Sequence, residues 1–138
     1  MHKMLTSLLL GLSLIWTLPA MSAADTSSAA NRAVYYQIEE PFTINFLNQS
    51  QQKARYLQIK VALMSHQANI IDNAKLNLPM IQDALRTLFT AQSYDNVSSV
   101  AGRTQLQQEA EHLVSSLLQE ETGQKGLDKV YFTSFILQ

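Results

Sequence analysis

The chain of 138 residues contains no cysteine. Disulfide bonds and thiolate metal sites are therefore excluded, and the absence is compatible with an oxidising periplasm without establishing one. Charged residues are also scarce, because they make up 15% of the chain and leave a formal net charge of −1. A nearly neutral chain lacks the basic surface that nucleic-acid binding requires, so we expect no nucleic-acid partner.

Recognisable catalytic and metal-binding motifs are missing as well. The sequence has no nucleophile elbow, Walker loop, dinucleotide-binding glycine pattern or H-E-x-x-H. Its three histidines, His2, His66 and His112, stand apart from one another, and Ser116 occupies the position where a helical metal pair with His112 needs its second ligand. We therefore predict no catalytic, cofactor-binding or metal site, and no cofactor.

Two adjacent carboxylate pairs, Glu39–Glu40 and Glu120–Glu121, are the nearest approach to an acid–base site. Neighbouring residues point in different directions on a strand or a helix, so we interpret both pairs as solvated charge at the ends of elements. Turn packing and helix capping explain the three remaining candidates for ligand binding, which are Asn45, Tyr94 and Arg103.

The first two dozen residues predict an export segment. Lys3 precedes an apolar run whose core, residues 8–18, has the length of a signal-peptide h-region. Pro19 ends this core and small residues follow it, which favours cleavage after Ala23 or Ala24. The alternative is an uncleaved anchor, but a spanning helix needs roughly 20 mostly apolar residues, and this run reaches that length only by including Pro19 and several hydroxyls.

The chain accordingly divides into three parts. Residues 1–24 form a signal peptide or membrane anchor, residues 25–33 a mostly small and polar flexible linker, and residues 34–138 one folded domain. A signal peptide and a membrane anchor would each direct the rest of the chain across the inner membrane. We therefore expect the domain in the periplasm, soluble or attached to the inner membrane.

Helical periodicity is strongest in residues 77–109, around which the rest of the domain is organised. Five apolar residues recur there at the steps of three and four that define one helical face: Leu78, Ile81, Leu85, Leu88 and Phe89. Residues 92–96 predict a polar turn, and Ser99 is the expected N-cap of a second long helix that ends near Gly123. Pro79 predicts a kink or fresh start where an earlier helix, from about residue 70, meets the first.

Period-two alternation predicts the strands. Residues 42–46 and 55–64 alternate apolar and polar side chains and most simply pair as an antiparallel hairpin with a loop of about seven residues. Residues 34–38 favour a further short strand. The order β-β-α-α-α-β predicts an α+β fold with a small, mainly antiparallel sheet covered by helices.

The C-terminal segment, residues 129–138, predicts a strand that is apolar on both faces. Alternation assigns three apolar residues to one face, namely Val130, Phe132 and Ile136. It assigns three more to the other face, namely Tyr131, Phe135 and Leu137. Such a strand is usually interior to a sheet or covered by helices.

The domain resembles the FliL family of flagellar basal-body-associated proteins over residues 35–138. No single motif is decisive, but several segments match the family in order and spacing: residues 40–42, 55–63, 79–85, 91–94, 102–103 and 132–135. The resemblance implies a periplasmic domain related in fold to the stomatin/prohibitin (SPFH) module, with no catalytic residue or cofactor. It also implies a role in motility, chemotaxis and flagellar rotation. In that role the protein associates with itself and contacts the MotA–MotB stator, which it helps to engage at high load.

Two departures from the family pattern affect these expectations. The family commonly has a basic cytoplasmic N-terminus and an uncleaved transmembrane helix, whereas this chain has only Lys3 and a signal-like segment. After Ser99, Val100 and Ala101 stand where the family often has proline and glutamate. Two alternatives to the flagellar role therefore stay open: a periplasmic SPFH-like scaffold outside the flagellum, and, less favoured, a periplasmic ligand-binding protein or hydrolase.

Overall fold

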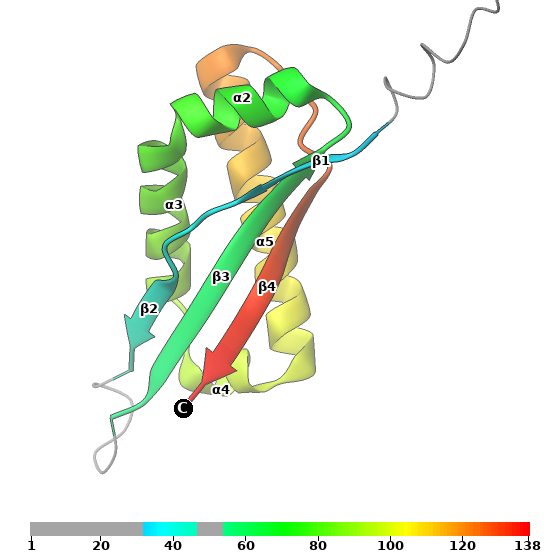
Figure 1. Cartoon of the computed structure of the whole chain (residues 1–138). Coiled ribbons are helices and arrows are strands. Elements are labelled where there is room, and N and C mark those ends of the chain that lie inside the picture. The colour runs from blue at the N-terminus through cyan, green and yellow to red at the C-terminus, as the bar shows by residue number, and fades with distance from the viewer. Residues whose placement is uncertain (1–31, 47–53) are drawn as a thin grey trace, which may run out of the picture.

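The computed structural model describes residues 32–46 and 54–138. The expected export segment, most of the linker and the hairpin loop therefore lie outside the described residues. One antiparallel sheet is built around a long central strand, as Figure 1 shows. Its strands are β1 (Val34–Gln37), β2 (Phe42–Asn45), β3 (Tyr56–Ser65) and β4 (Lys129–Leu137).

The central strand β3 pairs with β4 along one edge, and with β1 and β2 in succession along the other. The predicted hairpin is confirmed, because Phe42 pairs with Ile59 and Asn45 with Tyr56. The expectation that residues 42–46, 55–64 and 129–138 share one sheet is also confirmed. The connection Glu39–Pro41 separates β1 from β2, as expected where a proline cannot donate to a ladder.

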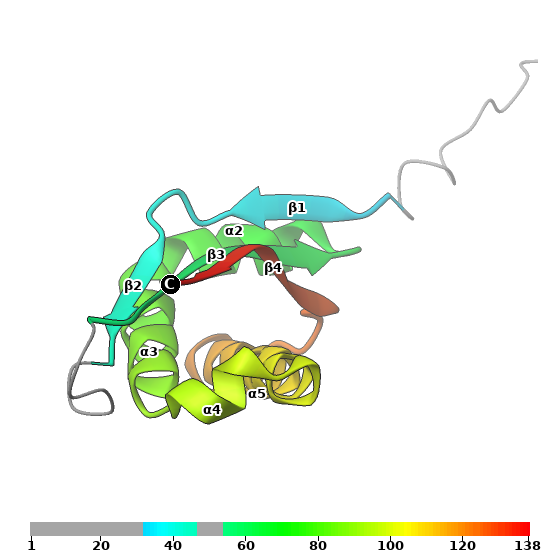
Figure 2. The ribbon, with the colours of Figure 1, turned by 90° about the horizontal axis from the view of Figure 1, so that it is seen from below.

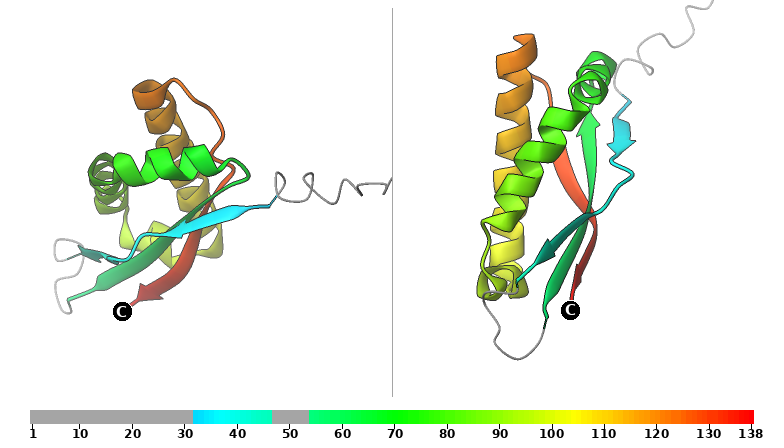
Figure 3. Two further views of the ribbon diagram at one scale, coloured as in Figure 1. Left: turned by 45° about the horizontal axis from the view of Figure 1, so that its top comes forward. Right: turned by 90° about the vertical axis from the view of Figure 1, so that its left-hand side faces the viewer.

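The helices of the described part of the chain all lie on one face of this sheet, as the right-hand view of Figure 3 shows. Figure 2 shows α3, α4 and α5 together on that side, while α2 crosses one end of it. The helices are α2 (Ala68–Leu76), α3 (Leu78–Thr90), α4 (Tyr94–Ser98) and α5 (Val100–Thr122). Among the described residues the order is β-β-β-α-α-α-α-β, so the predicted α+β class is confirmed. Strand β1 matches the short strand favoured at residues 34–38, and α4 is the one helix beyond the predicted order.

The core lies between the sheet and the helices. On β3, Leu57, Ile59, Val61 and Leu63 are fully buried. The predicted helical stripes meet them, because α3 buries three of its five periodic apolar residues and α5 buries a residue at every fourth position from Gly102 to Leu118. Burying a large apolar side chain contributes about 2 kcal/mol to the free energy of unfolding, so this layer is the main source of stability.

Three predicted helix boundaries are confirmed. A new helix, α3, starts at Leu78 beside Pro79, directly after α2 ends. The Ser99 side chain accepts a hydrogen bond from the Gly102 amide at 2.9 Å and so caps α5. Gly123 terminates α5 with a left-handed φ of 70°.

The predicted polar turn at residues 92–96 is in part wrong, because a short helix, α4, begins at Tyr94. Ser93 caps it by accepting from the Asn96 amide at 3.2 Å, and the Asn96 side chain donates to Gln92 at 2.8 Å. Val97 is fully buried in the core and holds the helix in place. A five-residue helix has too little periodicity to be recognised in sequence.

Strand β4 lies at an edge of the sheet, so the prediction that it is interior to the sheet is wrong. It pairs with β3 alone among the described strands. The alternative, coverage by a helix, is right for one face, where the Gln107 side chain of α5 donates to the Val130 carbonyl at 2.9 Å. This bond satisfies one of the carbonyls that an edge strand leaves without a ladder partner.

The predicted division of β4 into two faces is also wrong, because the strand contains a β-bulge. Lys60 pairs with Ser134 and Val61 with Phe132, which leaves Thr133 as an extra residue. After the bulge, the residues of β4 that would have faced the core face the opposite side of the sheet, and the others face the core. Four side chains therefore pack against the core, namely Val130, Phe132, Phe135 and Leu137.

Candidate interaction surfaces

The structure does not gather the titratable residues into a reactive cluster. Within residues 32–46 and 54–138, no group of three or more histidines, cysteines, aspartates or glutamates could hold a metal ion. His112 is exposed on α5, and His66 lies in the turn after β3. The Glu39–Glu40 pair is on the β1–β2 connection and the other carboxylate pair, Glu120–Glu121, is in the last turn of α5.

Tyr94 and Arg103 hold together the end of the domain where α4 precedes α5. The Arg55 guanidinium lies 3.9 Å from the centre of the Tyr94 ring, a cation–π contact between the start of β3 and α4. Arg103 Nε donates to the Val97 carbonyl at 3.0 Å. Asn45 is exposed on β2, so the three candidate ligand-binding residues do not form one site.

His66 and Asp128 join the α5–β4 connection to the β3–α2 turn. One carboxylate oxygen of Asp128, Oδ2, accepts from the His66 backbone amide at 2.7 Å and lies 2.9 Å from His66 Nδ1. The Ser65 hydroxyl donates to the Gly126 carbonyl at 2.5 Å and accepts from the Gln67 amide at 2.9 Å. This cluster was not predicted, since its residues are some sixty positions apart and match no motif.

The His66 backbone amide is the largest cause of a lowered pKa at Asp128, and the His66 side chain adds to it. A carboxyl whose pKa is lower in the folded protein contributes stability above its ordinary pKa and loses it as the pH falls through the folded value. We therefore predict that Asp128→Asn lowers the free energy of unfolding at neutral pH, by less than about 1 kcal/mol because the pair is exposed to solvent. The difference from the unchanged protein should shrink below about pH 4.

Urea unfolding at pH 7 and at pH 3 measures this prediction. Asp72→Asn is the matched control, because the Asp72 carboxylate is exposed and its Lys75 partner lies at 3.5 Å. The control should change stability less at pH 7. A difference between Asp128→Asn and the unchanged protein that grows on acidification would contradict the assignment.

A shallow groove of about 460 Å³ lies where α3 and α5 adjoin. Leu88 and Leu113 supply its apolar lining and polar side chains of α5 supply the rest, namely Gln105, Gln108, Glu109 and His112. A ligand-binding site or hydrolase centre needs an enclosed pocket with convergent polar groups. This groove is open to solvent and has one histidine and one carboxylate, both on the same helix.

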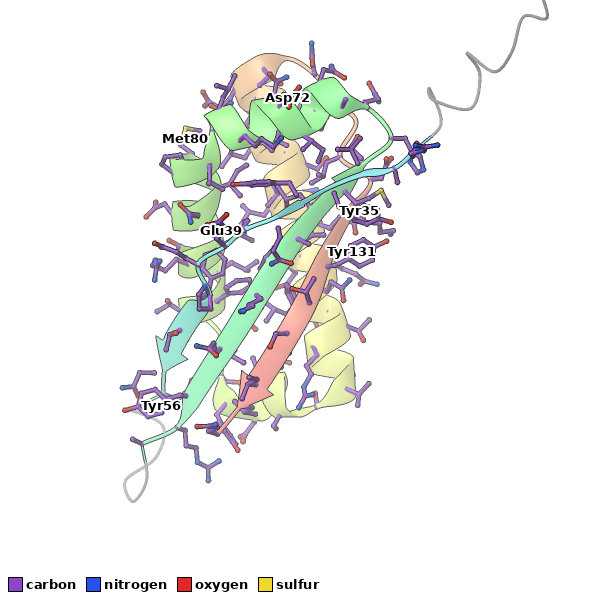
Figure 4. All side chains as sticks on the ribbon, viewed as in Figure 1. Tyr35, Glu39, Tyr56, Asp72, Met80 and Tyr131 are labelled. Atoms are coloured by element: carbon purple, nitrogen blue, oxygen red, sulfur yellow. The ribbon has the colours of Figure 1, made fainter. Side chains whose placement is uncertain are left out.

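The uncovered face of the sheet carries the more distinctive surface. Tyr35 is 61% exposed, Ile136 44% and Tyr56 41%. The Tyr35 and Tyr131 rings lie 6.3 Å apart, centre to centre, and Figure 4 shows the two side chains next to each other. Exposed tyrosines with few charges around them are typical of protein–protein interfaces.

The fold and these surfaces define a class: a small α+β domain with helices on one face of an antiparallel sheet and an exposed aromatic surface on the other. A comparison with protein families matches residues 35–138 to the family described as flagellar basal body-associated protein FliL. The chain belongs to the FliL family.

A curated relative supports the assignment. The flagellar protein FliL of Aquifex aeolicus (strain VF5) is 24% identical over 105 residues, which cover 76% of this chain. The aligned part spans 62% of that relative's length. Among the described residues no helix is long and apolar enough to cross a membrane.

Proposed function

We propose that this protein is a non-enzymatic accessory of the flagellar motor that self-associates and contacts the stator, an ion-driven torque generator of the MotA–MotB type. In this role it supports stator engagement when the motor works against high load. The observation that carries the proposal is the family match, which spans nearly all of the described residues. The exposed tyrosines of the sheet supply a surface suited to protein contacts.

The proposal includes a location. Residues 1–24 act as a signal peptide or membrane anchor, residues 25–33 as the linker, and the domain works in the periplasm, soluble or attached to the inner membrane. The SPFH-like relation in fold belongs to the same proposal, because such modules assemble into larger structures.

Deletion of the gene tests the proposed role. We expect deletion to slow swimming in viscous medium and swarming on soft agar more than swimming in thin medium, because stator engagement limits torque mainly at high load. A copy of the gene supplied from a plasmid should restore motility and controls for effects on neighbouring genes. Unchanged motility under viscous load would reject the flagellar role and favour the scaffold outside the flagellum.

A further inference from the structure

The edge of the sheet that β4 forms changes in character along its length. At its start, Lys129 supplies a charge, and the Gln107 side chain occupies the Val130 carbonyl at 2.9 Å. Residues 132–137, which we call the open edge, include no charged residue and no proline. In the described part of the chain they pair with β3 alone. Sheets usually protect an exposed edge with charge, proline or a covering segment, so the lack of all three indicates a site for a further strand.

The register shows which backbone groups of the open edge point away from β3. Gln138 and Tyr56 exchange two backbone hydrogen bonds, each of 2.9 Å. Hydrogen-bonded and non-hydrogen-bonded pairs alternate along an antiparallel ladder, so the amides and carbonyls of Leu137 and Phe135 point outward. Within the described part of the chain these groups have no backbone partner. Their spacing of two residues is the one that an added strand needs to form a ladder.

Side chains beside the open edge are incompletely covered. Three of them face the core but are only half-buried, namely Phe132, Phe135 and Leu137. Val130, at the protected start of the strand, is fully buried. On α5, the Arg103 guanidinium lies 4.9 Å from the centre of the Phe135 ring, and Val100, one turn earlier on the same side of the helix, is 81% exposed. A strand added between this side of α5 and the solvent would cover these apolar groups.

The opposite edge of the sheet is less suited to an added strand. It consists of β1 and β2, which have four residues each, and the Glu39–Pro41 connection separates them. Short strands interrupted by a proline do not offer a continuous ladder. The open edge of β4 is therefore the better site.

Arg103 indicates the charge of the missing strand. Its Nε donates to the Val97 carbonyl at 3.0 Å, but no carboxylate among the described residues forms an ion pair with it. Lys60, which lies opposite Ser134 on the neighbouring strand, has no such ion pair either. A carboxylate brought to this edge by a partner would complement both cations. A second copy offers none from its own open edge, because residues 132–137 are uncharged.

We propose that the open edge of β4 binds an extended segment of a partner protein as an additional strand of the sheet. The segment pairs with the outward backbone groups of Phe135 and Leu137, covers Val100 with an apolar side chain, and places a carboxylate beside Arg103. Figure 1 shows β4 along the margin of the sheet, with α5 beside it. The site goes beyond the proposed motor role, since it defines how a partner is held and does not depend on which protein supplies the strand.

A synthetic strand tests the site on the purified full chain in detergent. The probe is an acetylated and amidated peptide of about seven residues, a usual strand length, that alternates valine with threonine and has one central glutamate. In an NMR titration we expect saturable shifts at the backbone amides of the open edge and at Arg103. Hydrogen exchange of the Phe135 and Leu137 amides should slow. No shift at these positions, or equal shifts along β1 and β2, would overturn the proposal.

A proline substitution tests whether the backbone carries the binding. Leu137→Pro removes the outward N–H and spares the ladder with β3, because the Leu137 amide does not point toward β3. Leu137→Ala is the matched control, since both variants lose the leucine side chain. We expect the proline variant to bind the peptide about tenfold more weakly than the alanine variant, as for one hydrogen bond left unmade. Equal affinities would refute strand pairing.

Charge exchange tests the orientation and controls for folding. The unchanged protein should prefer the glutamate peptide to the same peptide with lysine in that place, whereas Arg103→Glu should prefer the lysine peptide. A misfolded variant would bind neither. Lys125→Glu, at an exposed position in the α5–β4 connection, is the matched control and should keep the original preference. A preference for glutamate that survives Arg103→Glu would contradict the placement of the carboxylate.

Sedimentation separates a partner strand from a second copy. Leu137→Pro and Leu137→Ala should self-associate equally in the full chain. Weaker self-association of the proline variant alone would assign the open edge to contacts between copies and overturn the proposal. Peptide binding is measured without the flagellar motor, so its failure and a failure of the motility experiment are distinguishable.

Discussion

Replacing Phe89 with alanine is expected to lower the free energy of unfolding by about 3–5 kcal/mol. Phe89 is fully buried on α3, and its ring meets Phe42 of β2 edge-on at 5.2 Å between centres and Phe132 of β4 at 5.7 Å. The variant therefore loses apolar burial and two aromatic contacts, and it leaves a cavity between the helix layer and two strands of the sheet.

Urea unfolding followed by circular dichroism measures this loss. Leu88→Ala is the matched control. Leu88 is the residue next to Phe89, but its side chain is only half-buried and lines the groove between α3 and α5. The control should cost under about 2 kcal/mol, the value for part of a leucine side chain. If Phe89→Ala unfolded within about 1 kcal/mol of the unchanged protein, Phe89 would not hold the two layers together as the structure indicates.

Gly102→Ala is expected to destabilise the protein by about 2 kcal/mol or more. Helix propensity alone predicts the opposite sign, since alanine in place of glycine stabilises a helix by about 1 kcal/mol. The structure decides between the two effects, because a Cβ atom at Gly102 would lie 1.9 Å from the backbone oxygen of Asn96. Relieving this clash requires α4 and α5 to move apart, which disturbs buried Val97.

Thermal unfolding compared with Gly123→Ala tests the sign. A Cβ at Gly123 meets nothing within 4 Å, but the φ of 70° strains alanine there, for a cost of about 1 kcal/mol. The Gly102 variant should be the less stable of the two. A Gly102→Ala protein more stable than the unchanged one would show that α4 does not pack closely against α5.

Local patterns predicted most of the fold correctly. Alternation located β2 and β3, the steps of three and four located α3 and α5, and Pro79, Ser99 and Gly123 marked helix ends through chemistry that acts within one turn. These features succeed because each depends on neighbours in the sequence.

Apart from the short helix α4, the errors come from contacts between distant segments. The bulge at Thr133 depends on pairing with β3 and exchanges the faces of Phe135 and Ile136, so parity alone assigned both wrongly. The sheet order also depends on such pairing, and it places β4 at an edge. The described helices all lie on one face of the sheet, and this arrangement follows from the same long-range packing.

The candidate surfaces were less predictable than the fold. Alternation placed Tyr56, Gln58 and Lys60 on one face of β3, but it gave no reason to join them with Tyr35 and Tyr131, which lie on two other strands. Glu39 and Glu40 were correctly interpreted as solvated charge. Their position beside Leu78 and Gln82 becomes visible only when α3 is packed in place.

Stator engagement at high load tests the central claim most directly. In a gene-deletion strain, fluorescently tagged stator units are counted at single motors of cells tethered in viscous medium. We predict fewer units per motor than in the parent strain, the parental number after the gene is restored, and no difference at low load. Equal numbers of engaged units with and without the gene at high load would contradict the claim that this protein supports the stator.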